Sequence, residues 1–404
     1  MADGVPVTPV RGAARRVLET LRNSGPLWTA SVILDRVLPY SVVRLWPEKQ
    51  VAPKLLADQV ETILRAWGMS AEHASITARH VVYADLHGID SHGCSMLWHY
   101  HMQRLEGSLT MTPTITVERD AETTALVNGG GGLGHVPADM AMKMAIAKCQ
   151  IAGLAAVAVC NSGHYGAAGA YAAMAAEVGL IGFATTNTRT RAVVPTLGTD
   201  AMLGTNPIAF AAPAVRNRPF LLDMATSTAS VGKLTMAWRH GRAIPEGWAV
   251  NAKGVALTDG RAAAVHRRLT PLGSTHEMGS HKGYGLAVAM EILSSVLPGG
   301  QGRADTTSRV GHFFLTIDPR RFRDHGEFEA DLDALMDSLH ASRPVDPKRP
   351  VLVAGDPEYA ASATRQHTGI PLTRRVVEDI RTVARAAAAP FLLDRKTPTS
   401  GAPR

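Results

Sequence analysis

The sequence has few cysteines and no long uninterrupted hydrophobic run. The three cysteines among its 404 residues, Cys94, Cys149 and Cys160, form no C-x-x-C pair. This argues against a disulfide framework and a cysteine-based zinc site, and it favours a reducing compartment, so we expect a cytoplasmic protein. No cleavable signal segment is recognisable. Charged residues and a proline interrupt the apolar stretch at 28–46, which falls short of the about 20 apolar residues of a membrane span, so we expect no membrane partner.

The sequence also lacks a dense basic patch interleaved with aromatic residues. Lys and Arg number 42 against 35 for Asp and Glu, which gives a net charge of +7. The excess gathers in two places, an N-terminal stretch and a C-terminal helix: Arg11, Arg15, Arg16, Arg22, Arg374, Arg375, Arg381 and Arg385. This distribution argues against nucleic-acid binding. Solubility and attraction for an anionic ligand, such as a pyrophosphate cofactor, account for it.

An apolar content of 46% in a chain of this length indicates a globular protein with two or more hydrophobic cores, because single cores seldom grow past about 250–300 residues. The mixed order of helices and strands favours an α/β or α+β fold. We expect an N-terminal extension at 1–50 with a short basic helix over Ala13–Arg22, and a helical domain at 51–111 joined by part of the C-terminal region. Next we expect a cofactor- and substrate-binding domain at 112–275. Helices and strands at 276–393 then complete both domains, and a loose tail follows at 394–404.

Apolar residues at helical spacing predict a helix from Pro53 to Trp67, and Ser70 is the expected N-cap of a second helix that runs to Leu86. Further helices are predicted over 135–150, 171–177, 282–297 and 372–389. Strands are predicted over 115–118, 124–127, 154–159, 181–184, 208–212, 220–222, 312–318 and 351–354. In the helix over 282–297 the apolar residues are expected to be buried: Leu286, Val288, Met290, Ile292, Leu293 and Val296.

Residues 129–134, Gly-Gly-Gly-Gly-Leu-Gly, match G-x-G-x-x-G between a predicted strand and a predicted helix. This is the context of a Rossmann phosphate loop, which also needs an acidic residue at the end of the next strand to bind the ribose hydroxyls. That strand ends instead in Cys160-Asn161, and a run this rich in glycine fits the pattern easily by chance. The motif by itself leaves a Rossmann loop as the weaker alternative.

Five histidines lie close together in the sequence and raise the possibility of a zinc site: His80, His87, His92, His99 and His101. Gly88 and Gly93 interrupt the helix that would align them, and no cysteine ligands accompany them. The segment from His276 to His281 is one residue longer than H-E-x-x-H, which turns the second histidine off the chelating face. We therefore expect no metal site.

Two histidine-bearing turns are candidates for chemistry. Ser91 and His92 lie at a break between helices, where a histidine can donate to a substrate oxygen and can carry charge near neutral pH. An ordinary helix junction with Ser91 as N-cap is the alternative. His164 lies in a Gly-His-x-Gly turn after an apolar strand, a position that carries active-site residues in many α/β enzymes. It suits a general acid/base for a carbonyl–alcohol or imine–amine pair, although a lone loop histidine can also be merely structural.

Three further segments carry groups that suit a nucleotide cofactor. Leu203–Pro207 and Asp223–Ser227 combine a strand end with hydroxyl, amide and turn residues, which can bind ribose hydroxyls, a carboxamide or phosphate oxygens. Lys282 opens a predicted helix, so its ammonium and the free amides of the first turn form a favourable anion site. None of these segments is specific alone.

Taken in order, these segments resemble the malate/L-lactate dehydrogenase family of the second type, which also contains ureidoglycolate dehydrogenase and Δ1-piperideine-2-carboxylate reductase. The resemblance runs from about Val51 to Leu372. It rests on the order and spacing of seven stretches: Ala84–Gly93, His164–Gly169, Leu203–Pro213, Asp223–Lys233, Ile244–Asp259, Lys282–Leu286 and Gln366–Leu372.

The resemblance implies an α/β fold with a mixed sheet, in which NAD(P) binds to a non-Rossmann fold accompanied by a helical domain. It also implies a homodimer, NAD or NADP as cofactor, no metal, and a small-molecule substrate that is a 2-oxo/2-hydroxy acid or a cyclic imino acid. Carried over by position, His164 is the proton donor and acceptor, and Ser91 and His92 line the substrate pocket. The implied cofactor contacts are Thr188, Asp223, Met224, Ala225, Lys282 and Gly355, the last in an Ala-Gly-Asp sequence where the family often has Pro-Gly-Glu.

The sequence departs from the family pattern at the position that usually carries an arginine for the substrate carboxylate, four residues after the pocket histidine. Met96 stands there. Either another cation takes the role, with Arg189 and Arg191 near Thr188 in the sequence, or the substrate lacks that carboxylate. In addition, residues 195–198 replace a more glycine-rich turn, and the first 50 residues have no counterpart. We expect an NAD(P)-dependent dehydrogenase or reductase; the alternative is a catalytically silent dimer that binds a cofactor or a partner.

Overall fold

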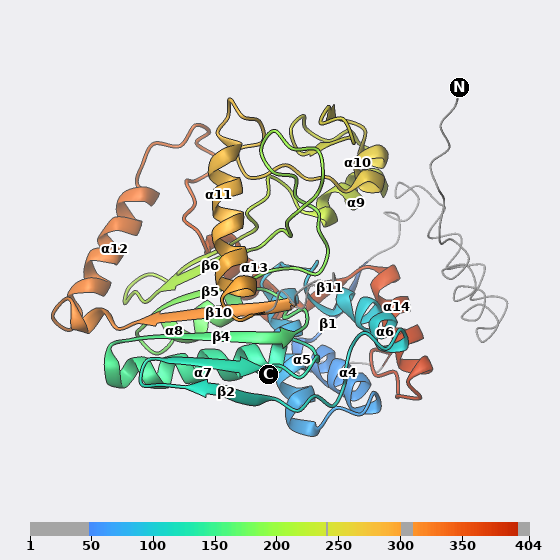
Figure 1. Cartoon of the computed structure of the whole chain (residues 1–404), viewed down its shortest axis with the longest axis horizontal. Helices are drawn as coiled ribbons and strands as arrows, with labels where there is room; N and C mark the ends of the chain where they lie inside the picture. Colours follow the sequence, from blue (N-terminus) through green and yellow to red (C-terminus); the bar gives the residue numbers. More distant parts are fainter. Residues whose placement is uncertain (1–47, 240, 300–309, 395–404) are drawn as a thin grey trace, which may run out of the picture.

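The computed structural model describes residues 48–239, 241–299 and 310–394. The basic helix predicted over Ala13–Arg22 and residues 395–404 of the predicted tail lie outside these ranges. Figure 1 shows one large sheet with helices packed against it, a helical layer built from both ends of the described chain, and a smaller unit around α9 and α10.

The large sheet has seven strands in the order β2-β3-β4-β10-β5-β6-β7. Strands β3 and β4 are parallel and are joined through helix α7, whereas every other neighbouring pair is antiparallel. The predicted mixed α/β sheet is therefore confirmed, and a doubly wound parallel sheet of the Rossmann type is excluded. The strands are β2 (Thr116–Asp120), β3 (Thr124–Asn128), β4 (Leu154–Ser162), β5 (Ile181–Thr186), β6 (Ile208–Ala212), β7 (Phe220–Met224) and β10 (Val310–Ile317).

Two helices rich in small residues cover the sheet. Helix α7 (His135–Ala152) packs on β4 and β10, and α8 (Gly169–Ala176) packs on β5 and β6. Small residues let these helices approach the strands closely: a Cβ on Gly182 of β5 would overlap the carbonyl oxygen of Ala172 in α8. This close packing fixes α8 against β5 and β6, and the turn that carries His164 connects β4 to α8.

The helical layer combines the start and the end of the described chain. Figure 1 shows α4 and α5 beside α14, and their buried residues form one hydrophobic core with strands β1 and β11. Helix α4 begins at the predicted Pro53, and Ser70 caps α5 by accepting a hydrogen bond from the His73 amide at 3.1 Å, so both predictions are confirmed. The elements are β1 (Lys49–Val51), α4 (Pro53–Ala66), α5 (Ala71–Leu86), η1 (Cys94–Met96), α6 (Leu97–Leu105), β11 (Ile370–Leu372) and α14 (Arg374–Ala386).

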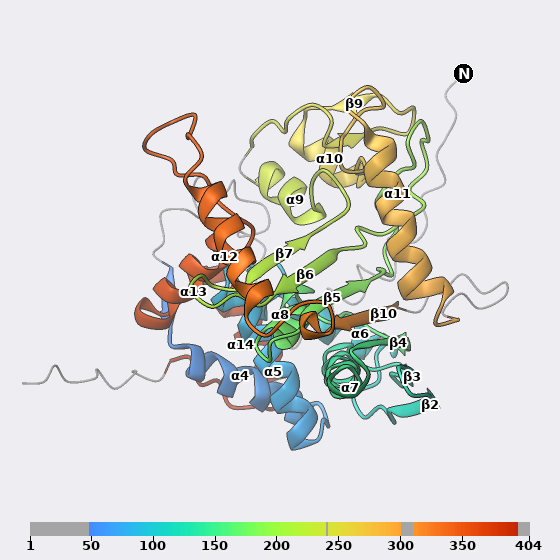
Figure 2. The ribbon, with the colours of Figure 1, turned by 90° about the vertical axis from the view of Figure 1, so that its left-hand side faces the viewer.

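A smaller unit with its own core follows β7, and Figures 1 and 2 show α11 running from this unit down to the sheet. Its elements are α9 (Val231–Arg239), β8 (Ala249–Val250), β9 (Ala256–Leu257), α10 (Gly260–His266), α11 (Ser280–Glu291) and the π-helical turn η2 (Ile292–Val296). The predicted burial of the apolar residues in this helix is wrong for three of them, because Leu286, Ile292 and Val296 are exposed. Met290 is buried as predicted, and Ser294 and Ser295 are the buried residues that the prediction left out.

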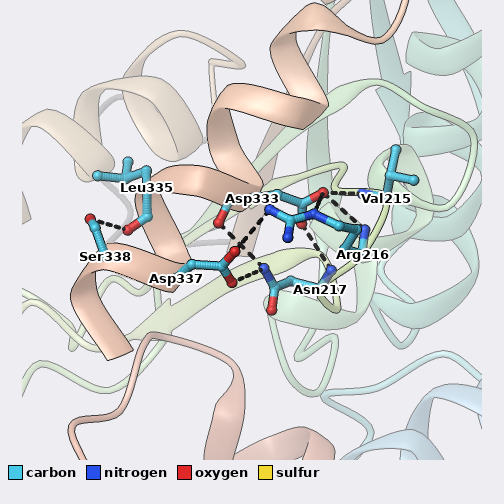
Figure 3. Close-up of polar contacts among 7 residues, drawn as sticks. All are labelled: Val215, Arg216, Asn217, Asp333, Leu335, Asp337 and Ser338. Atoms are coloured by element: carbon cyan, nitrogen blue, oxygen red, sulfur yellow. Dashed lines mark hydrogen bonds and ion pairs between the residues drawn. The ribbon is translucent and has the colours of Figure 1, made fainter. Parts of the chain in front are cut away.

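The last part of the chain contains η3 (Pro319–Arg321), α12 (Glu327–His340) and α13 (Asp356–Thr368). The strand predicted over 351–354 is wrong, because that segment has no partner strand. Helix α12 is held to the turn between β6 and β7 by two carboxylates, as Figure 3 shows. The buried Asp333 accepts from the backbone amides of Val215, Arg216 and Asn217 at 3.2, 2.9 and 2.8 Å, and Asp337 accepts from the side chains of Arg216 and Asn217.

Replacing Asp333 with alanine is expected to lower the free energy of unfolding by about 1–3 kcal/mol, because three backbone amides lose their acceptor. Burial alone would raise the pKa of this carboxyl, but the backbone hydrogen bonds lower it below its usual range in net. The contribution is therefore present at neutral pH and is lost as the pH falls through the folded-state pKa. Urea unfolding at pH 7 measures it, with Asp337→Ala as the exposed control that changes stability little. If Asp333→Ala and the parent protein were equally stable, the hydrogen bonds of Asp333 would not contribute to the free energy of unfolding as expected.

Candidate active site

A pocket of about 900 Å³, called here the central pocket, opens beside the ends of β4, β5 and β7. This volume is in the range of about 300–1,000 Å³ that is typical of small-molecule sites. Its wall is made by the turn after α5, one side of α6, the turn after β4, the loop after β5 and the segment from the end of β7 into α9. Segments far apart in the sequence therefore meet at one cavity.

The turn that carries Ser91 and His92 is held from inside by Asp85. The Asp85 carboxylate accepts from the Cys94 amide at 2.7 Å, and a Cβ on Gly93 would overlap that carboxylate, so glycine is required there. Burial raises the pKa of Asp85 to about 7. From outside, Arg365 of α13 forms an ion pair with Asp90. The turn is thus fixed on both sides.

The alternative in which Ser91 is the N-cap of an ordinary helix junction is wrong, because η1 begins at Cys94 and its N-cap is Gly93. The Ser91 hydroxyl is instead 2.8 Å from Nδ1 of His92, and both residues line the central pocket. Burial lowers the pKa of His92. A neutral imidazole tied to a hydroxyl is suited to orienting a ligand oxygen or nitrogen.

His164 follows β4 and also lines the central pocket, with its ring stacked on His92 at a centroid distance of 5.4 Å. The hydroxyl of Tyr100, from α6, is 2.7 Å from Nδ1 of His164. The Gly166 amide also lies 3.3 Å from Nδ1 and donates to it when that nitrogen is bare. When the ring hydrogen lies on Nδ1, the Tyr100 hydroxyl accepts it and Nε2 is the basic nitrogen. This leaves Nε2 of His164 available to a ligand.

The pKa of His164 is lowered well below its usual value, first by burial and then by the neighbouring imidazoles of His92 and His135. The ring is therefore neutral at physiological pH. A neutral imidazole is a base, so the geometry and the charge state together allow His164 to take a proton from a bound hydroxyl group.

The sequence did not single out Tyr100, which is fully buried on α6. In the sequence Tyr100 looks like any aromatic residue of a hydrophobic core. No local pattern distinguishes a core tyrosine from one that hydrogen-bonds a pocket histidine. Ser162 and His312, which lie beside the same turn, were missed as well. A histidine at the first position of the strand predicted over 312–318, as His312 is, was the available signal; the observed strand begins two residues earlier, at Val310.

The predicted cofactor residues fall into two groups. Thr188 and Asp223–Ala225 line the central pocket. Asp223 also accepts from the amide of Gly169 at the start of α8 at 2.7 Å, and burial raises its pKa to about 6. Lys282 lies in the first turn of α11, and Gly355 caps α13 with φ 102°; neither lines the pocket, and their predicted cofactor contacts stay predictions.

The chemistry of the pocket wall fits a dinucleotide. Six hydroxyl side chains in the loops after β5 and β7 line it and can bind ribose and phosphate oxygens: Thr188, Thr190, Thr205, Ser227, Thr228 and Ser230. Two cations, Arg189 and Lys233, line it too. Arg191 does not reach the pocket, and Met96 packs against the hydrophobic core of the helical layer instead.

The glycine run at 129–134 packs against neighbouring backbone. A Cβ on Gly129 would lie 3.0 Å from the Asn161 carbonyl oxygen, and one on Gly130 would lie 2.6 Å from the Thr114 carbonyl oxygen. The run therefore lets two loops approach each other closely. Of its residues, Gly131 lines the central pocket.

The clustered histidines serve separate contacts. His80 is 3.1 Å from the Asp139 carboxylate, His87 is 2.8 Å from the Tyr83 carbonyl oxygen, and His101 stacks on Trp67. Across the described ranges no group of three or more His, Cys, Asp or Glu side chains could hold a metal ion. No helix in the described part of the chain is both long enough and apolar enough to span a membrane.

The mixed sheet, the helical layer and the histidine-lined pocket together define a non-Rossmann class of α/β protein. Residues 51–381 match the family model described as malate/L-lactate dehydrogenase, and the chain belongs to this family.

Similar proteins cover most of the chain. It is 40% identical over 330 residues to a malate dehydrogenase of Pyrococcus horikoshii, covering 80% of this chain and 91% of that protein. It is 35% identical over 352 residues to an L-sulfolactate dehydrogenase of Methanothermobacter thermautotrophicus, covering 85% and 97%. The crystal structure of malate dehydrogenase from Entamoeba histolytica superposes with a TM-score of 0.80 at 30% identity, covering 85% and 99%.

Proposed function

We propose that this protein is an NAD- or NADP-dependent dehydrogenase that interconverts a small 2-hydroxy acid and its 2-oxo acid, or a cyclic imino acid and its amine, with His164 as the acid/base. The observation that carries the proposal is His164 itself, neutral, held at Nδ1 by Tyr100 and stacked on His92 in the central pocket. Malate and L-sulfolactate, which the relatives' names mention, are both 2-hydroxy acids.

When bound, the nicotinamide ring supplies or accepts the hydride. For that cofactor the hydroxyl-lined wall with Thr188 and Asp223–Ala225 provides the binding groups. In the oxidation direction the ring hydrogen lies on Nδ1 and is accepted by the Tyr100 hydroxyl, so Nε2 of His164 takes the proton of the substrate hydroxyl. In the reduction direction the protonated ring returns that proton to the developing alkoxide or amine. Ser91 and His92 hydrogen-bond the reacting oxygen or nitrogen and orient it. Donors aimed at developing charge in this way are each worth about 10²–10³-fold in rate at comparable sites.

We propose Arg189 as the residue that binds the substrate carboxylate in place of the missing family arginine. It lies next to Thr188 on the pocket wall, and its charge contributes, after burial, to lowering the pKa of His99, which lines the same pocket from α6. Guanidinium pairs with a carboxylate in a bidentate geometry. Met96 cannot do so.

We propose that the protein acts as a homodimer in the cytoplasm. The exposed apolar residues of α11 and η2, Leu286, Ile292, Val296 and Leu297, support a further subunit contact there. The chain has only three cysteines and no C-x-x-C pair, which suits a reducing compartment.

Fluorescence titration with NADH and NADPH, followed by a panel of 2-oxo acids, cyclic imines and neutral ketones, tests the function. Tight binding of one cofactor with turnover of a panel member is the expected result. Binding of neither cofactor would refute the dehydrogenase proposal. Cofactor binding without turnover of any member would favour the catalytically silent dimer.

The lowered pKa of His164 predicts the pH dependence of 2-hydroxy acid oxidation. The reaction needs the neutral ring, so kcat/KM is expected to stay level as the pH falls to the ordinary histidine range and to decline only below it. In the reduction direction, which needs the protonated ring, the rate is expected to fall as the pH rises. A profile of kcat/KM against pH at saturating cofactor measures this. An acid limb at or above the usual histidine pKa would contradict the assigned charge state.

A further inference from the structure

Three side chains, Thr186, His312 and Ser162, form a hydrogen-bonded series, and Ser162 lies on the wall of the central pocket. Nδ1 of His312 is 2.8 Å from the Thr186 hydroxyl, and Nε2 of His312 is 2.8 Å from the Ser162 hydroxyl. Ser162 is the last residue of β4 and lines the central pocket two residues before His164. None of the proposed catalytic roles uses this hydrogen-bonded series.

The ring of His312 is fixed by its place in the sheet. It lies on β10 between β4 and β5, opposite Thr186, beside an irregularity in the pairing with β4. The side chain is fully buried, stacks on Tyr165 with a centroid distance of 4.5 Å, and has Nε2 2.8 Å from where a Cβ on Gly134 would be. Burial lowers the pKa of His312 to about 3, so the ring is neutral and carries one N–H.

The surroundings of Thr186 decide which nitrogen carries that hydrogen. The Thr186 hydroxyl lies 2.8 Å from the Gly311 carbonyl oxygen and 2.9 Å from the Asn187 carbonyl oxygen. Carbonyl oxygens can only accept, so the single hydrogen of the threonine hydroxyl points to them, bonded to one or shared between both, and the hydroxyl oxygen accepts from Nδ1–H of His312. If the threonine hydroxyl instead donated to a bare Nδ1, the two buried carbonyl oxygens would face the lone pairs of the hydroxyl oxygen and lack a donor there.

With the proton on Nδ1, Nε2 of His312 is a bare acceptor, and the Ser162 hydroxyl must donate to it. The single proton of Ser162 is then turned away from the pocket. Only the lone pairs of its oxygen face the ligand space.

We propose that Ser162 is a ligand-binding residue whose hydroxyl acts only as an acceptor, and that it recognises a neutral N–H or O–H donor on the bound ligand. It discriminates against groups that carry only lone pairs, such as a carbonyl or a carboxylate oxygen. This inference rests on the proposed function for the identity of the ligand. The donor is either the carboxamide N–H of the nicotinamide or the hydroxyl of the 2-hydroxy acid, and the experiments distinguish the two.

The first test reads the tautomer in the protein without ligands. In protein with ¹⁵N-labelled histidine, the ring nitrogens of His312 are assigned with a His312→Gln variant. The expected result is a hydrogen on Nδ1 and a bare Nε2. A hydrogen on Nε2 would overturn the proposal. In a Thr186→Val variant, which removes the acceptor of Nδ1–H, the preference for this tautomer is expected to disappear.

The second test compares reduced NAD with its 3-acetylpyridine analogue, which lacks the carboxamide N–H. If the cofactor is the partner, the preference for the carboxamide is expected to fall by about 3- to 10-fold in Ser162→Ala, the effect of one neutral hydrogen bond. If the substrate is the partner, that preference stays. L-malate binding to the NADH complex then weakens by a similar factor relative to oxaloacetate binding to the NAD⁺ complex.

Ser338→Ala, the same change on the exposed face of α12, is the matched control and is expected to behave as the parent protein. Ser162→Ala protein with both preferences unchanged would overturn the proposal. If the parent protein binds no nicotinamide cofactor, the proposed function fails, whereas the tautomer measurement still reports on Ser162 and His312 independently.

Discussion

Replacing His164 with alanine is expected to reduce kcat about 10²–10⁴-fold, the usual contribution of a positioned acid/base. The side chain lines the central pocket, its Nδ1 is occupied by Tyr100, and its Nε2 faces the ligand space, so its loss removes the proton acceptor without removing the pocket wall. Steady-state kinetics of the best panel substrate, together with fluorescence titration of the cofactor, measures the two effects separately. Cofactor affinity is expected to change little.

Two variants sharpen this result. Tyr100→Phe keeps the ring and removes the hydroxyl that holds His164, so kcat is expected to fall by about 10-fold or more, as for the loss of a hydrogen bond to a group that becomes charged. His325→Ala, at an exposed position before α12, is the matched histidine control and should keep full activity. Unchanged turnover in His164→Ala would show that another group moves the proton.

Replacing Arg189 with glutamine is expected to reduce kcat/KM for a 2-oxo acid about 10- to 100-fold, the effect of losing a hydrogen-bonded partner of a charged group. Most of the loss should appear in KM, because the carboxylate is bound in the ground state as well as in the transition state. For a neutral ketone of similar size the same variant is expected to change little. Kinetics with the two substrates side by side tests this difference.

Arg191→Gln is the matched control, because Arg191 lies two residues away and does not line the central pocket. Arg189→Lys keeps the charge but loses the planar fork, so partial recovery is expected. An equal loss for the neutral ketone and the 2-oxo acid would assign Arg189 to the structure of the loop. No loss for either would point to Lys233 as the cation for the carboxylate.

The regular elements could be predicted where the signal is local. The helix from Pro53, the Ser70 cap and strand β6 depend on residues within a few positions of one another. Two predictions that depended on distant partners were wrong. Leu286 and Ile292 are exposed because nothing in the described chain packs on that side of α11, and residues 351–354 found no strand to pair with.

The candidate site could be predicted in part. The sequence indicated His164, Ser91 and His92, and the structure places all three at one pocket. It gave no indication of Tyr100, because a buried tyrosine on a helix resembles any core aromatic residue. For His312 the only local signal was a polar residue in a strand, which does not reveal its partners. Their roles depend on hydrogen bonds to residues far away in the chain.

The sequence by itself determined the family, the mixed α/β class and the turn that carries the proposed acid/base, because short stretches in a fixed order and spacing indicate all three. Only the tertiary structure decided which cation reaches the pocket, which hydroxyl holds His164 and in which direction Ser162 turns its proton. Each of these depends on atoms brought within about 3 Å by packing, and hydrogen bonds act only at that range. Linear spacing carries no information about contacts between strands as distant as β4 and β10.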